Sequence, residues 1–335
     1  MLLASIVGLV ANGDDGFAKE LAKIVSPKAV VYLRTSLESD SKYRFTFLDS
    51  EAKATGTLIA DDSLNDIQIS PDGTMAVACF YGMDLEKDKS FWHYIVANKN
   101  GMVASIDVDR MASFKWSGSS ILFYGNQYPL TQWGPVPDSD QWTTNKISSI
   151  QTANLILDKN HYWVFQDAKP TELDSKGAIV QTLPNSLQIS DLLLVLPDSS
   201  QCFTKTAEGS EETGTDLSRL SVWDQKANTE KVLTHRMHSD SIVWLSGSGY
   251  FGYFIQNTPY RDQLAFYSPS TGRVQSLGAA NLFLPSCAAL DARTAIVVAG
   301  VGQKQFVYYV NPESGTMREI TVPDSPSPDF VSACR

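Results

Sequence analysis

Short apolar runs that end in a polar turn recur along this chain, and most of them are followed by a glycine. The clearest copies are residues 44–49, 93–98, 219–224, 263–268 and 306–311. In the three C-terminal copies, Ser221, Ala265 and Tyr308 hold the same position at intervals of 44 and 43 residues. A period of this size is typical of an array of repeated supersecondary units.

The apolar runs themselves have the composition of β strands. They are rich in Val, Ile, Phe, Tyr and Thr, and Gly, Asn, Asp, Ser and Pro separate them. They group into seven units, or into six if residues 111–183 form one unit with a long insertion. A four-stranded unit has two apolar faces, and stacking around a ring covers both. We therefore predict an all-β fold, a β-propeller of seven four-stranded blades in one domain, residues 1–335, with six blades as the alternative.

The two ends of the chain carry further signals. Residues 16–25 are the one helical pattern, with Pro27 just beyond as a stop. Residues 1–10 are apolar but have no preceding positive charge, so we expect a buried first strand rather than an export signal. Residues 330–334 follow a proline-rich stretch, and we expect them to close the ring by pairing with the first blade. Neither end carries a terminal signature, so the sequence leaves open whether the chain is part of a longer protein.

Two stretches do not follow the strand pattern. Residues 127–146 contain two tryptophans and three prolines without alternation, and we interpret them as an inserted aromatic, proline-rich loop. Residues 207–216 are rich in Gly, Glu and Thr and are interpreted as a flexible loop.

One turn resembles a motif of known propellers. Ser70-Pro71-Asp72-Gly73 is similar to the turn between the first two strands of a blade in WD-repeat proteins, Tol-type propellers and prolyl-oligopeptidase propellers. In this turn Pro presets φ, Asp caps the backbone and Gly takes a positive φ.

A second match lies in the C-terminal half. Trp223-Asp224 resembles the dipeptide that names the WD repeat, and His238 resembles the histidine that opens the next repeat. Met237 stands where that family prefers glycine, and the other units lack the Trp-Asp pair. The resemblance implies a WD-repeat-like propeller, a fold that commonly serves as a protein-interaction scaffold, and it identifies no particular member.

Charge and cysteine content narrow the classes of partner. The chain has 27 basic and 37 acidic residues, a net charge of -10 at pH 7 and a sequence pI near 4.9. This balance argues against nucleic acid or an anionic membrane as the main partner, and no apolar stretch is long enough to span a bilayer. Cys79, Cys202, Cys287 and Cys334 are widely spaced, which favours buried thiols and a cytoplasmic location, with the periplasm or secretion as the alternative.

The sequence shows no pattern of enzymatic chemistry. It contains no GxSxG elbow, P-loop, HExxH or Cys/His cluster, so we assign no catalytic, cofactor-binding or metal-binding residue and expect no cofactor. Of the four histidines, His238 is expected to be structural and His161 to lie exposed in a turn.

The aromatic segment is the strongest candidate for binding. Tyr128, Trp133 and Trp142 are residue types that often anchor protein interfaces and also stack on sugars. The competing interpretation is that the segment folds back onto one end of the ring. We predict a non-enzymatic scaffold that binds protein partners in a larger assembly. The alternative is a secreted or periplasmic propeller that binds or hydrolyses a glycan.

Overall fold

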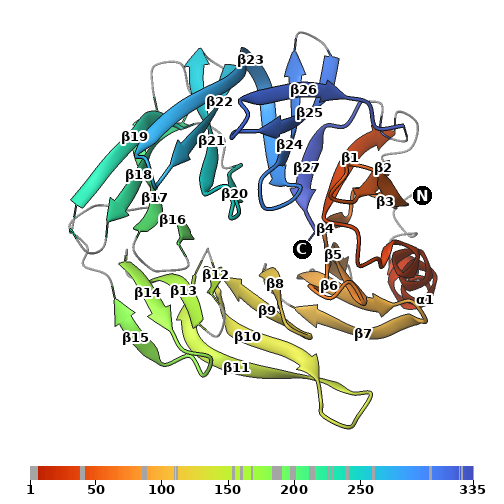
Figure 1. Ribbon diagram of the computed structural model, residues 1–335. Coiled ribbons are helices and arrows are strands. Elements are labelled where there is room, and N and C mark those ends of the chain that lie inside the picture. Colours follow the sequence, from red (N-terminus) through yellow and green to blue (C-terminus); the bar gives the residue numbers. More distant parts are fainter. Residues whose placement is uncertain are drawn as a thin grey trace.

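The computed structural model is a ring of antiparallel β sheets with one helix at its edge (Figure 1). The structure describes residues 7–37, 42–84, 89–108, 110, 112–152, 155–158, 161–166, 169–182, 191–196, 201–210, 216–224, 227, 229–237, 241–258, 261–301, 304–323, 325 and 327–334. All statements below concern these residues.

Four blades are separate four-stranded sheets, each numbered outward from the ring axis. Blade 1 contains β4 (Leu64–Ile69), β5 (Met75–Asp84), β6 (Lys89–Asn98) and β7 (Gly101–Val108). Blade 2 contains β8 (Ser113–Ser117), β9 (Ser120–Gly125), β10 (Tyr128–Pro135) and β11 (Trp142–Gln151). Blade 3 contains β12 (Leu155–Asp158), β13 (His161–Gln166), β14 (Lys169–Leu173) and β15 (Ile179–Thr182). Blade 7 contains β27 (Phe330–Ala333), β1 (Val31–Leu37), β2 (Lys42–Leu48) and β3 (Ala54–Asp61).

The other three blades share one continuous sheet because the strand β23 (Arg273–Ala289) belongs to two of them. Its first part pairs with β22, with Arg273 opposite Ser268, and its last part pairs with β24, with Ala289 opposite Ala295. Blade 4 contains β16 (Asp191–Val195), β17 (Gln201–Ser210), β18 (Asp216–Asp224) and β19 (Thr229–Met237). Blade 5 contains β20 (Val243–Leu245), β21 (Tyr250–Thr258), β22 (Arg261–Ser268) and the start of β23. Blade 6 contains the end of β23, β24 (Ala295–Val301), β25 (Lys304–Asn311) and β26 (Thr316–Ile320). The described residues thus form seven blades, which confirms the predicted propeller.

The two ends of the chain meet in blade 7, as expected. The last strand, β27, is the innermost strand of that blade and pairs antiparallel with β1, with Phe330 opposite Arg34 and Ala333 opposite Val31. The following residue continues the closure, because the Ile69 amide of blade 1 donates to the Cys334 carbonyl over 2.5 Å. The C-terminal segment therefore joins the first and last blades and leaves no open edge between them.

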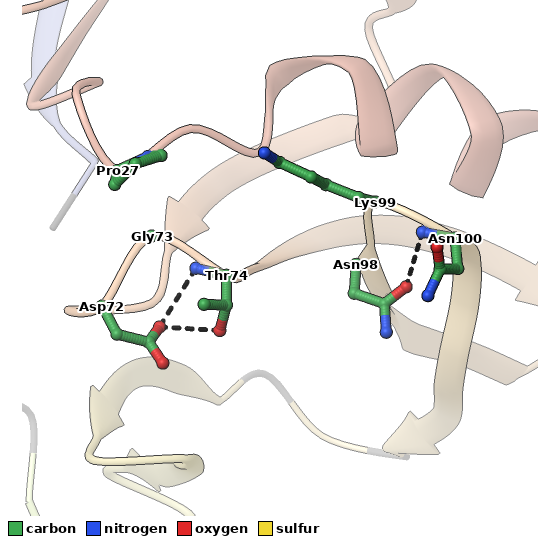
Figure 2. A pocket seen from close by; sticks show the side chains of 7 residues that line it. All are labelled: Pro27, Asp72, Gly73, Thr74, Asn98, Lys99 and Asn100. Atoms are coloured by element: carbon green, nitrogen blue, oxygen red, sulfur yellow. Dashed lines mark hydrogen bonds between the residues drawn. The ribbon is translucent and has the colours of Figure 1, made fainter.

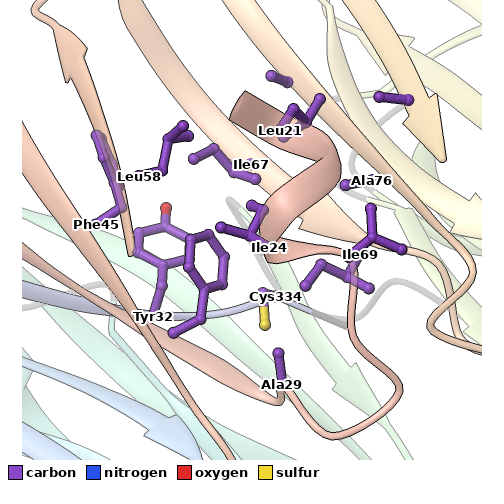
Figure 3. Packing of buried hydrophobic residues seen from close by; sticks show 14 of the residues in the cluster. Leu21, Ile24, Ala29, Tyr32, Phe45, Leu58, Ile67, Ile69, Ala76 and Cys334 are labelled. Atoms are coloured by element: carbon purple, nitrogen blue, oxygen red, sulfur yellow. The ribbon is translucent and has the colours of Figure 1, made fainter. Parts of the chain in front are cut away.

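The helix α1 (Val7–Ile24) fills the outer gap between blades 7 and 1 (Figure 3). Leu21 and Ile24 are buried among residues of β2, β3, β4 and β5, together with Cys334 from the closing segment. Phe17 meets Phe80 of β5 edge-on, with ring centroids 4.7 Å apart. The described helical residues include no segment with the length and apolar character needed to cross a membrane.

The helix begins earlier than its sequence pattern indicated. We expected residues 1–10 to form a buried strand, but residues 7–10 are the first turns of α1, so that expectation is wrong for them. Residues 1–6 lie outside the described part of the chain. An apolar run without period-2 alternation is compatible with helix or strand, and here its continuity with the next helical turns decides the outcome.

The turn Ser70-Pro71-Asp72-Gly73 joins the first two strands of blade 1, as its resemblance implied. The Asp72 carboxylate accepts hydrogen bonds from the Thr74 amide at 3.1 Å and the Ser70 hydroxyl at 2.6 Å. These bonds lower the pKa of Asp72. Gly73 has φ of +70°, and a Cβ at this position would lie 2.2 Å from the Pro27 Cα, so only glycine fits.

The two predicted loops are instead strands where the structure describes them. Residues 127–146 form most of β10 and β11, the outer hairpin of blade 2, with Pro135 opposite Trp142. The prolines are tolerated because Pro129 lies at a register shift and Pro135 at the end of its strand. Residues 207–210 belong to β17 and Asp216 opens β18, whereas residues 211–215 lie outside the described part.

Candidate interaction surface

The three aromatic residues singled out in the sequence lie together, but they face the interior of the ring. Trp133 is 2% exposed and packs between blades 1 and 2. Its ring stacks on Phe123 at 5.9 Å and meets Trp142 edge-on at 4.9 Å. Tyr128 also contacts Phe123, at 6.2 Å, and both Tyr128 and Trp142 are half-buried. Trp133 is therefore a core residue and offers no surface to a partner.

The histidines lie in contacts with carboxylates on neighbouring strands or on the helix. His93 is buried and contacts Asp107 of β7 at 2.5 Å and Asp14 of α1 at 3.1 Å, so it helps to hold the helix against blade 1. His161 pairs with Glu172, and His235 pairs with Glu208 at 3.0 Å. His238 lies outside the described residues. No group of three or more potential metal ligands occurs in the part of the chain that the structure describes.

All four cysteines are buried free thiols. Burial raises the pKa of Cys79, Cys202 and Cys287 to about 12. The thiolate is the reactive form of cysteine, so these three side chains are poor nucleophiles at neutral pH. This confirms the buried thiols expected from the sequence for Cys79 and Cys287.

Polar side chains on the inner strands connect neighbouring blades. Asp66 of β4 accepts a hydrogen bond from the Tyr32 hydroxyl of blade 7 at 3.2 Å, and Gln68 donates to the Phe114 carbonyl of blade 2 at 3.0 Å. Lys115 of blade 2 donates to the Leu155 carbonyl of blade 3 at 2.5 Å. Desolvation raises the pKa of Asp66 and lowers the pKa of Lys115 to about 8. These contacts set the angle between blades at the ring axis.

The Lys115 site predicts a pH dependence of stability. Because its folded-state pKa of about 8 is below the ordinary value of 10.5, the protonated ammonium opposes folding below pH 8. That cost is lost as the pH rises through this interval, since the unfolded chain then binds more protons than the folded one. We expect urea unfolding to show that wild type gains stability relative to Lys115→Met between pH 8 and pH 10.5. A difference that stays constant across this interval would show that Lys115 is hydrated in the folded state.

A shallow hollow lies beside the segment that leaves α1 (Figure 2). It is lined by two turns of blade 1 and by Pro27. Its polar groups already have partners, because Asp72 bonds to Thr74 and the Asn98 side chain accepts from the Asn100 amide at 2.8 Å. Gly73 contacts Pro27 closely. The hollow is therefore a by-product of turn packing and is a weak candidate for a site.

Exposed apolar side chains fall into two groups. One group is distributed singly or in pairs over the fourth, outermost strands of five blades: Ile59, Met102, Ile179, Val180, Val232 and Val274. Isolated apolar residues of this kind are normal on a protein surface. The other group comprises Leu284, Val301 and Phe330, which are 57%, 37% and 36% exposed and lie at strand ends on one face of blades 6 and 7.

Leu284 is the central residue of this second group. It has φ of +44°, one of three non-glycine residues with positive φ in the described chain. A register shift between Phe283 and Ser286 marks a β-bulge at this point of β23. A bulge turns a side chain away from the direction that strand alternation would give it, and a left-handed leucine is costly. The fold thus holds a large apolar side chain in solvent at a strained position.

Neighbouring residues complete a continuous surface around Leu284. Phe283 lies opposite Gly300, and the Arg261 guanidinium covers the Phe283 ring at 5.5 Å. Lys304 lies opposite Val301 and is exposed. The Val331 amide donates to the Ser286 hydroxyl at 3.0 Å, which places Phe330 beside β23. We define the end-face patch as Arg261, Phe283, Leu284, Val301, Lys304 and Phe330.

The sequence gave no warning of this surface. Residues 282–284 are Leu-Phe-Leu, and such a run is typical of a buried strand. Leu282 is fully buried as expected. The following proline, Pro285, was the one available signal, since proline in a strand often marks a bulge.

No protein-family model and no curated protein matches the chain. Solved structures do resemble it. An uncharacterized protein, lmo1340 from Listeria monocytogenes EGD-e, superposes with a TM-score of 0.54 at 13% identity, covering 90% of this chain and 94% of that one. The dihydro-heme d1 dehydrogenase NirN gives 0.53 at 11% identity, covering 92% and 76%.

A third structure gives the same result. The β-propeller domain of Cps50 (Swd1) from Myceliophteria thermophila superposes with a TM-score of 0.51 at 9% identity, covering 87% of this chain and 96% of that one. At such low identities the likeness concerns the fold alone. The chain is a β-propeller that resembles WD-repeat propellers, and the resemblance singles out no particular member.

Proposed function

We propose that this propeller is a protein-interaction module that binds a partner through the end-face patch and acts as a subunit of a larger assembly. The observation that carries the proposal is Leu284, a leucine that is 57% exposed and held at positive φ by a bulge. Strained backbone persists where the surrounding structure enforces it, and it concentrates at binding sites. Aromatic and aliphatic anchors next to arginine are common at the centres of protein interfaces.

The placement of the patch also favours this role. It lies on strand ends rather than on the outer strands, and it draws on residues from blades 5, 6 and 7. A partner seated there would contact elements that the ring already holds rigid, so little ordering would be lost on binding. The buried free thiols support a reducing compartment such as the cytoplasm for this assembly.

The glycan-binding alternative has less support. It depended on Trp133 and Trp142 as a surface on which sugars could stack. Trp133 is buried against Phe123, and Trp142 packs on Trp133. The proposal therefore moves the binding surface from residues 127–146 to the end-face patch.

The test is affinity capture of the tagged chain from its own cells, with mass spectrometry of the eluate. Wild type is compared with Leu284→Asp and with the control Val274→Asp, an exposed valine on the outer part of β23. Aspartate adopts positive φ more readily than leucine, so Leu284→Asp is expected to fold normally. We expect it to reduce the captured partner at least about tenfold, while Val274→Asp leaves capture unchanged. Equal capture by all three proteins would contradict the proposal.

A further inference from the structure

The segments that form the end-face patch differ in charge from the rest of the molecule. The chain carries ten more acidic than basic residues. Residues 257–261, 278–285 and 301–304, which contain all of the patch except Phe330, include Arg261 and Lys304 and no acidic residue. The surface around Leu284 is therefore locally positive on a negative protein.

These two cations are available to a partner. Within the described residues neither Arg261 nor Lys304 forms an ion pair, and the Arg261 guanidinium contacts only the face of Phe283. Asp262, the acidic neighbour of Arg261, is fully buried and faces away from solvent. Farther along the patch, Arg34 is neutralised by Asp329 at 3.0 Å. The unneutralised charge next to Leu284 is thus positive.

We propose that the end-face patch binds an acidic peptide segment of its partner, one that carries an apolar side chain beside its carboxylates. The apolar side chain packs on Leu284, Val301 and Phe330, and the carboxylates pair with Arg261 and Lys304. This inference rests on the proposed function and names the chemistry of the partner. Buried apolar contacts supply most of the affinity in such an arrangement, and the charges supply specificity and a faster encounter.

The overall charge sharpens the selectivity. An acidic segment is repelled by most of the surface, because the molecule carries a net charge of -10, and is attracted where Arg261 and Lys304 lie. A neutral apolar segment would have no such preference, and a basic segment would be drawn to other faces. The same net charge disfavours a second copy of this chain as the occupant.

The experiment measures binding of short synthetic peptides to the purified full chain by fluorescence anisotropy. Each peptide carries one leucine or phenylalanine flanked by glutamates, by serines or by lysines. We expect the glutamate peptides to bind about tenfold more tightly than the serine peptides at low salt, with the difference shrinking as salt is added. Lysine peptides are expected to bind most weakly. Serine or lysine peptides that bind as well as glutamate peptides would overturn the inference.

Variants separate the charge from the apolar contact. Lys304→Glu and Arg261→Gln should remove the preference for glutamate, and Leu284→Asp should weaken all peptides that bind. The control is Lys99→Glu, which changes an exposed lysine in a turn of blade 1 and should change nothing. If no peptide binds, or if Lys304→Glu binds glutamate peptides as wild type does, the inference is wrong.

The two proposals fail in different ways. Loss of the cellular partner in Leu284→Asp, with capture unchanged in Lys304→Glu, keeps the interaction module and overturns the acidic partner. Gel filtration of the free chain decides whether the patch is covered by a second copy. A dimer that Leu284→Asp dissociates would also overturn the acidic peptide as occupant.

Discussion

Replacing Val331 by aspartate is expected to destabilise the ring by about 4 kcal/mol or more. Val331 is 1% exposed and packs with Val31, Leu33 and Ile296 between blades 6 and 7. A carboxylate at this position loses its hydration and meets apolar side chains on both sides. Urea unfolding followed by tryptophan fluorescence measures the free energy of unfolding directly.

The reason for so large an effect is the place of Val331 in the ring. It lies on β27, the strand that joins the end of the chain to β1. The same strand bonds to blade 6 through Ser286, and Cys334 just beyond it bonds to blade 1 through Ile69. Loss of this one strand leaves apolar faces of neighbouring blades in contact with water.

The control for this change is Val274→Asp. Val274 is 43% exposed on the outer part of β23, so its replacement should alter the free energy of unfolding by no more than about 0.5 kcal/mol. If Val331→Asp is tolerated as well as this control, the C-terminal strand does not close the ring in solution.

Much of the fold could be predicted because local chemistry and global architecture agree at the repeated turns. Ser70, Asp72 and Gly73 each have a local role in the turn between two strands, and that role is the same in isolation and in the ring. The spacing of such turns then determines the number of strands in each blade. Closure by residues 330–333 was predictable for a related reason, since an open ring would expose two apolar faces.

Blade 2 shows where this reasoning fails. Its outer hairpin was read as a loop because Pro129, Pro135 and Pro137 interrupt the alternation. In the structure the first proline lies at a register shift and the second at a strand end, where a missing amide costs no ladder bond. Whether a proline breaks a strand or decorates its end depends on the partner strand, and the sequence of one strand does not contain that information.

The end-face patch could not be predicted for a different reason. The exposure of Leu284 follows from a bulge and a positive φ, and both depend on how β23 crosses from blade 5 to blade 6. Side-chain identity alone would place Leu284 in the core, as it correctly places Leu282. The residues predicted to bind, by contrast, were chosen for their type, and Trp133 of that type lies in the core.

Replacing Trp133 by alanine tests that reassignment. The side chain is 2% exposed and packs on Phe123 and Trp142, so its removal should leave a cavity and cost about 3–5 kcal/mol of unfolding free energy. Trp142→Ala is the matched control, because its side chain is half-buried on the same hairpin and should cost clearly less. At temperatures where both variants remain folded, capture of the partner should equal that of wild type. If Trp133→Ala keeps full stability and loses the partner, Trp133 is a surface anchor, and the binding site lies on blade 2 rather than on the end-face patch.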